Sequence, residues 1–150
     1  MKRTIFSLIL VVFWMILIFY LSHQPATESN RLSKGLATKM VTLVENNSQE
    51  TNFNIGRFNY KIRKNAHFFI YLVLGILTIN WLNSRNIYGL KAVVLAVLIC
   101  VLYAISDEIH QLFVPGRGSQ VKDVILDTAG AITGILGYKF LSSLRRKPDS

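Results

Sequence analysis

The chain has 150 residues, 51% of them hydrophobic, and a formal net charge of +9. This length suits a single domain, 1–150, and the apolar residues gather in four long runs, which indicates a membrane protein rather than a soluble core. The basic residues flank these runs instead of lining a helix face, so we expect membrane lipids as partners and no nucleic acid. The only cysteine, Cys100, excludes an internal disulfide and a cysteine-based metal site.

The first apolar run, at about 5–21, follows a basic start. A secretory signal peptide shares this pattern, but the run is longer than an ordinary signal core and no Ala-x-Ala cleavage pattern follows it. We therefore predict an uncleaved transmembrane helix.

The polar stretch that follows carries Leu, Met and Val at helical spacing, which predicts a short amphipathic helix at about 29–44 on the membrane surface or capping the bundle. Residues 46–59, rich in Asn and Ser, indicate a loop.

Three further apolar runs predict transmembrane helices at about 66–82, 90–110 and 124–141. The predicted fold is all-α: a four-transmembrane-helix bundle with the short amphipathic helix between helices 1 and 2. Four spans place both termini on one side of the membrane. The basic residues are almost evenly divided between the two sides, but the basic start of the first helix favours cytoplasmic termini.

Ionisable side chains gather where the second helix starts, the third ends and the fourth starts. These three helix ends lie at the same membrane face, where charged groups are costly unless they are paired or functional. Separations of three and four residues align the side chains into polar stripes that point toward one shared pocket. The candidate site residues are Arg63, Lys64, His67, Tyr71, Asp107, Glu108, His110, Gln111, Arg117, Asp123 and Asp127.

Several of these residues also have ordinary explanations. His67 and His110 suit hydrogen-bonded histidines at the membrane interface. Asp107 and Glu108 are adjacent and point about 100° apart on a helix, so one of them could serve only as a cap or face solvent. Asp127 is harder to explain without a function, because it lies deeper in an apolar stretch.

The histidines and carboxylates supply enough ligands for zinc or manganese. However, no pair of histidines has the spacing of a helical metal motif such as His-Glu-x-x-His, and such side chains also form proton relays and ion-pair networks. The sequence therefore predicts no metal and no cofactor.

Small residues recur in the fourth predicted helix. Gly130 and Gly134 form a Gly-x-x-x-Gly motif, which Gly137 extends. Small residues at this spacing let helices approach closely. We expect them to serve packing within the bundle rather than dimerisation.

These residues also resemble the VanZ-like family of small bacterial membrane proteins. The matching elements, in family order, are Leu21-Ser22-x-Gln24-Pro25, Arg63-Lys64-x-x-His67-Phe68-x-x-Tyr71-x-x-Leu74-Gly75, Ser106-Asp107-Glu108-x-His110-Gln111 with Pro115-Gly116-Arg117, and Asp123-x-x-x-Asp127-x-x-Gly130-x-x-x-Gly134. Where the family has Ser-Ser-Gln after the first helix, this chain has Ser22-His23-Gln24. The resemblance implies a multi-pass protein of the bacterial cytoplasmic membrane. The family's namesake is associated with low-level resistance to teicoplanin, a glycopeptide that carries a lipid tail and acts at the outer face.

Two functions from different classes fit these observations. The first is a non-enzymatic envelope protein whose outer-face pocket binds an anionic or lipid-linked ligand, with Arg63, Lys64 and Arg117 meeting its phosphate or carboxylate groups. The second is a membrane-embedded enzyme acting on a lipid or cell-wall precursor. There Asp107 or Glu108 would be the general base, with His67 or His110 as acid partner. In a third, structural hypothesis, the charged side chains form a network that only holds the helices of the bundle together.

Overall fold

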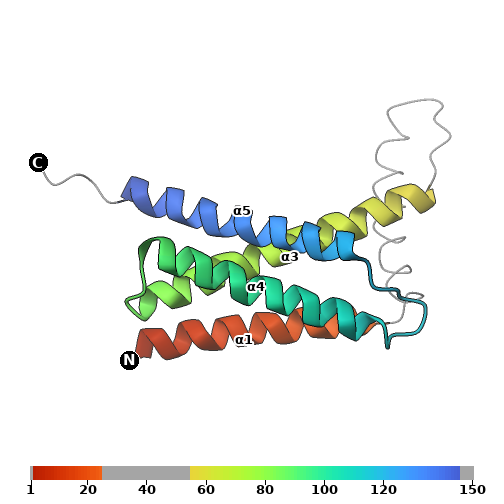
Figure 1. The fold of residues 1–150 in the computed structure, drawn as a ribbon, viewed down its shortest axis with the longest axis horizontal. Helices are drawn as coiled ribbons and strands as arrows, with labels where there is room; N and C mark the ends of the chain where they lie inside the picture. The colour runs from red at the N-terminus through yellow and green to blue at the C-terminus, as the bar shows by residue number, and fades with distance from the viewer. Residues whose placement is uncertain (1, 25–54, 146–150) are drawn as a thin grey trace, which may run out of the picture.

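The computed structural model describes residues 2–24 and 55–145 of the chain, and the side chains of 2–24 and 64–144. These residues form four helices: α1 (Lys2–His23), α3 (Ile55–Ser84), α4 (Gly89–Gln111) and α5 (Val121–Arg145) (Figure 1). The described part of the chain contains no strand, which confirms the all-α prediction. The amphipathic helix predicted at about 29–44 lies outside the described residues.

All four helices are long and apolar enough to span a membrane. The spans are Lys2–His23, Lys64–Ser84, Gly89–Gln111 and Val121–Leu144. Large apolar side chains point outward, among them Phe6, Phe13 and Phe140, each more than half exposed. A soluble protein rarely exposes so much apolar surface, whereas lipid tails cover it without cost. The four predicted transmembrane helices are confirmed.

The start of α3 differs from the prediction. This helix begins at Ile55, so the loop predicted over 46–59 is wrong for 55–59. Ile55, Phe58 and Ile62 are spaced by three and four residues, a helical pattern that the Asn-rich composition obscured.

Two helices form the middle of the bundle. Both α3 and α4 contact each other, α1 and α5, whereas the described parts of α1 and α5 do not touch. In Figure 1, α1 and α5 accordingly flank the α3–α4 pair on opposite sides, and α1 begins at the end of the bundle where α5 finishes. The opposite end therefore collects the end of α1, the start of the α3 span, the end of α4 and the start of α5.

Polar side chains attach α1 to the central pair. The Trp14 indole donates to the Ile70 carbonyl at 2.9 Å, and the Tyr103 hydroxyl donates to the Met15 carbonyl at 2.5 Å. Such bonds between membrane helices contribute about 0.6 kcal/mol each on average. They fix the rotation of α1, which turns Ser22 toward the end of α4.

Candidate functional site

Close contact between α3 and α5 builds the framework of the site. Gly75 on α3 and Gly130 and Gly134 on α5 have no room for a side chain, because a Cβ at any of them would collide with a backbone carbonyl of the facing helix. The expectation that the small residues of the fourth helix serve packing within the bundle is confirmed for Gly130 and Gly134, but not for Gly137, whose Cβ position has no atom within 4 Å. With the two backbones in contact, polar side chains one or two turns away on α3 and α5 must also meet.

Two pairs of oppositely charged or ionisable side chains form between α3 and α5. The Lys64 ammonium lies 2.6 Å from a carboxylate oxygen of Asp123. One turn deeper, His67 Nδ1 lies 3.6 Å from Oδ1 of Asp127. The side chains of Lys64 and Asp123 are 25% and 22% exposed, whereas Asp127 is 0% exposed. The outer pair is therefore accessible and the inner carboxylate is sealed within the bundle.

The last turn of α4 adds two buried carboxylates. Asp107 accepts hydrogen bonds on Oδ2 from the Ser22 hydroxyl of α1, at 2.9 Å, and from the Gln111 amide, at 3.2 Å. Its Oδ1 has no hydrogen-bond partner among the described residues. Asp107 is thus held firmly through one oxygen, while the other is left for a different contact.

Glu108 has a separate position and a separate partner. Its Oε2 accepts the backbone N–H of Gln120, at 2.9 Å, immediately before α5 begins. In the same connection, Arg117 donates to the Leu21 carbonyl of α1 at 3.3 Å. Both adjacent carboxylates are buried, because the end of α4 is surrounded by α1, α3 and α5. Glu108 therefore anchors the α4–α5 connection through Oε2, whereas its buried Oε1 has no hydrogen-bond partner among the described residues.

The structure gathers most of the predicted site at one end of the bundle. We call the following residues the ionisable cluster: Lys64, His67, Asp107, Glu108, Arg117, Asp123 and Asp127. Gln111 binds Asp107, and Tyr71 is fully buried one turn along α3 from His67. The side chain of Arg63 is outside the described part.

His110 lies apart from this cluster. Its Nε2 is 3.2 Å from Nδ1 of His23 at the end of α1, and its ring packs on Phe19 with centroids 4.3 Å apart. The side chain thus lies half-buried on the α1 side of α4, beside the exposed His23. Its partner there is a second imidazole, and its place suits the interfacial explanation better than a role beside Asp127.

Sequence reasoning assigned no role to Ser22, His23 or Gln120, each of which contacts a predicted site residue. A signal was available for Ser22, because it belongs to the Leu-Ser-x-Gln-Pro element at the end of the first apolar run. For Gln120 no side-chain signal could exist, since its backbone makes the contact.

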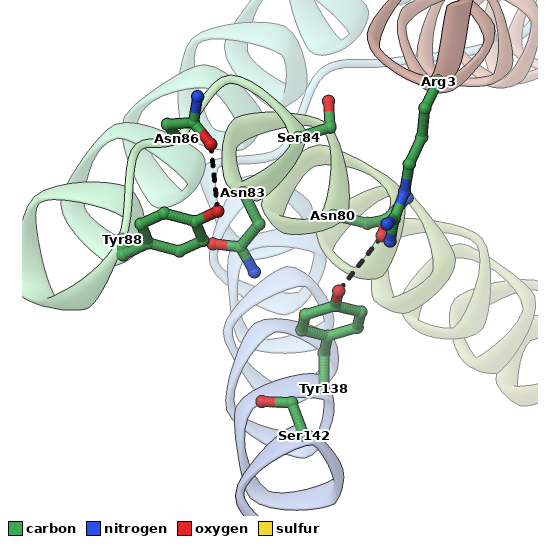
Figure 2. A pocket seen from close by; sticks show the side chains of 8 residues that line it. All are labelled: Arg3, Asn80, Asn83, Ser84, Asn86, Tyr88, Tyr138 and Ser142. Carbon is green, nitrogen blue, oxygen red and sulfur yellow. Dashed lines mark hydrogen bonds between the residues drawn. The ribbon is translucent and has the colours of Figure 1, made fainter. Parts of the chain in front are cut away.

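Two cavities lie at the other end of the bundle. The larger, of about 320 Å³, is lined by Arg3 of α1 and by amide and hydroxyl side chains of the other elements (Figure 2). In it, Tyr138 donates to Asn80 at 3.1 Å and Tyr88 donates to Asn86 at 3.2 Å. The second cavity, of about 250 Å³, adjoins the start of α4. No predicted site residue lines either of them.

Comparison with known proteins identifies a family. The family model described as VanZ/LLP1 matches residues 6–142, nearly the whole chain. The match includes all of the ionisable cluster and the glycines of the α3–α5 contact. No curated protein and no solved structure matches the chain.

Proposed function

Since the chain belongs to the VanZ/LLP1 family, we propose that it acts in the bacterial cell envelope and binds an anionic or lipid-linked ligand at the ionisable cluster. This membership bears out the VanZ-like resemblance of the sequence. The proposal includes both termini in the cytoplasm, so that the cluster faces outward from the cytoplasmic membrane. It also includes a contribution to teicoplanin tolerance, by analogy with the family's namesake.

The observation that carries this proposal is the change in exposure through the cluster. Lys64 and Asp123 are about a quarter exposed, whereas Asp107, Glu108 and Asp127 are at most 3% exposed. A phosphate or carboxylate at the membrane surface can therefore reach the Lys64 ammonium and compete with Asp123 for it. Beneath this pair, the Asp127 carboxylate lies beside the imidazole of His67 and keeps it directed into the cluster.

An enzymatic alternative has its own supporting observation. His67 presents Nδ1 to the buried Asp127 carboxylate, an arrangement that orients an imidazole for general acid–base catalysis. A substrate would be a lipid or cell-wall precursor entering from the bilayer. Turnover that His67→Gln abolishes while ligand binding remains would favour this alternative over a binding protein.

The test is the teicoplanin susceptibility of a deletion strain that carries the wild type or a single variant. We expect the wild type to restore tolerance, and Lys64→Ala and His67→Ala to restore at most a small part of it. Lys91→Ala is the matched control, because Lys91 is an exposed cation at the opposite end of the bundle. Glu108 is a poor choice here, since replacing it also frees the Gln120 N–H.

Membrane protein levels separate the outcomes. Lost tolerance at normal levels of the Lys64 and His67 variants supports a ligand site. Lost tolerance together with lost protein supports the structural hypothesis instead. If the wild type changes nothing, the teicoplanin part of the proposal is wrong, and lipids that copurify with the protein become the next candidates for the ligand.

A further inference from the structure

Three side chains from three different helices converge inside the ionisable cluster. His67 of α3, Asp107 of α4 and Asp127 of α5 each offer a donor atom, and these atoms all lie within 4.8 Å of one another. Asp107 and Asp127 are 3% and 0% exposed, and His67 lies at the rim with 22% of its side chain exposed. The bundle thus places one nitrogen and two oxygen donors around a common point.

The spacing of these atoms is informative. The 3.6 Å between His67 Nδ1 and Asp127 Oδ1 is longer than the roughly 2.7–3.2 Å of an N–H···O hydrogen bond. Two donors that each lie about 2.1 Å from a tetrahedral zinc ion are about 3.4 Å apart. The spacing of the two side chains is therefore also that of two ligands that share a cation.

Buried oxygens around this point lack hydrogen-bond partners among the described residues. They are Oδ1 of Asp107, both oxygens of Asp127 and the hydroxyl of Tyr71, which lies within electrostatic range of both carboxylates. Buried polar atoms of this kind are uncommon and call for an explanation. Ser22 and Gln111 both donate hydrogen bonds to Oδ2 of Asp107. In metal sites, hydrogen bonds of this kind orient a carboxylate whose other oxygen binds the metal.

Charge balance points the same way. Among its described side chains, the ionisable cluster has four carboxylates but only one lysine, Lys64, and one arginine, Arg117. Burying carboxylates without compensating positive charge is costly. A divalent cation would supply two positive charges at the point where the donors converge.

We propose that His67, Asp107 and Asp127 bind one divalent cation. A set of one imidazole and two carboxylates suits Zn²⁺ or Mn²⁺. Three protein ligands leave a coordination position open, which a phosphate or carboxylate oxygen of a ligand can fill. The cation site itself does not depend on the proposed envelope ligand, because the protein alone supplies the three ligands.

The test measures metal binding by the full-length protein in detergent, after EDTA treatment and desalting. Isothermal titration with Zn²⁺, and separately with Mn²⁺, is expected to give about one ion per chain for at least one metal. His67→Gln and Asp127→Asn are each expected to weaken that binding at least ~10-fold. The control is the double variant His23→Gln/His110→Gln, which removes the other two histidines of the chain and should bind the metal as the wild type does.

Three results would overturn the proposal: no binding of either metal by the wild type, unchanged binding by the folded His67 and Asp127 variants, or a loss confined to the His23/His110 variant. Circular dichroism establishes whether each variant is folded. Should both site variants fail to fold, X-ray absorption of the metal-loaded wild type decides. One imidazole with oxygen donors supports the site, and two imidazoles contradict it.

Discussion

At the end of the bundle where α1 begins, the polar side chains are mostly amides and hydroxyls around a cavity of about 320 Å³. At the other end they are carboxylates, an imidazole and cations packed between α1, α3, α4 and α5. The amide and hydroxyl groups bind one another, as Tyr138 and Asn80 do, whereas several carboxylate oxygens of the cluster have no hydrogen-bond partner among the described residues.

This difference indicates what each end contributes. Neutral groups that satisfy one another are inexpensive in a membrane and add modestly to helix association. Buried carboxylates with unused oxygens cost stability, and proteins keep such features mainly where a function requires them. The two ends can therefore be distinguished by how the protein responds when each is altered.

The largest effect is expected from the glycines of α5. In Gly130→Ala the new Cβ collides with the Phe68 carbonyl of α3, so the helices must separate beside the cluster. We expect the free energy of unfolding, measured in SDS–detergent mixtures, to fall by about 3 kcal/mol or more. Gly137→Ala is the control, because no atom lies within 4 Å of its Cβ position, and a change within about 0.5 kcal/mol is expected. Equal losses in the two variants would contradict this view of the interface.

An intermediate effect of opposite sign is expected from Asp127→Asn in metal-free buffer. The substitution keeps the shape of the side chain and removes a buried negative charge from a cluster rich in carboxylates. The variant should gain about 1–2 kcal/mol over the wild type in EDTA, because an ionised carboxylate buried without hydrogen-bond partners costs more than a neutral amide of the same shape. Thermal melting with and without EDTA measures the gain. A variant less stable than the metal-free wild type would instead support a structural ion-pair network.

The smallest effect is expected at the opposite end. Tyr138→Phe removes only the hydrogen bond to Asn80, so the protein should lose about 0.6 kcal/mol, the average for such bonds between membrane helices. Neither metal binding nor teicoplanin tolerance should change. A loss of tolerance in this variant would mean that the 320 Å³ cavity, and not the ionisable cluster, is the working site.

The spans and the polar stripes could be predicted from the sequence because they depend on local patterns. Each apolar run carries its own length and hydropathy, and the spacing of Lys64 and His67 and of Asp123 and Asp127 fixes the face that each pair shares. The close packing of Gly130 and Gly134 was predictable for the same reason.

The contacts between helices could not be predicted in the same way. Spacing along one helix does not give its rotation against its neighbours, and that rotation buries both Asp107 and Glu108 and turns His110 toward His23. The three candidate cation ligands illustrate this limit. A search for two ligands on one helix misses them, because α3, α4 and α5 each contribute one.

The arrangement of α1 and α5 on opposite sides of the central pair has a consequence for biosynthesis. Ribosomes deliver the helices in chain order, so α1, α3 and α4 reach the bilayer first, and the Ser22 hydroxyl can already find Asp107. Asp123 and Asp127, which pair with Lys64 and His67, arrive only with α5. Until that insertion, neither of these two ion pairs can form. Nascent chains that stall before α5 should therefore be degraded by membrane proteases faster than the complete protein, in which the cluster is fully assembled.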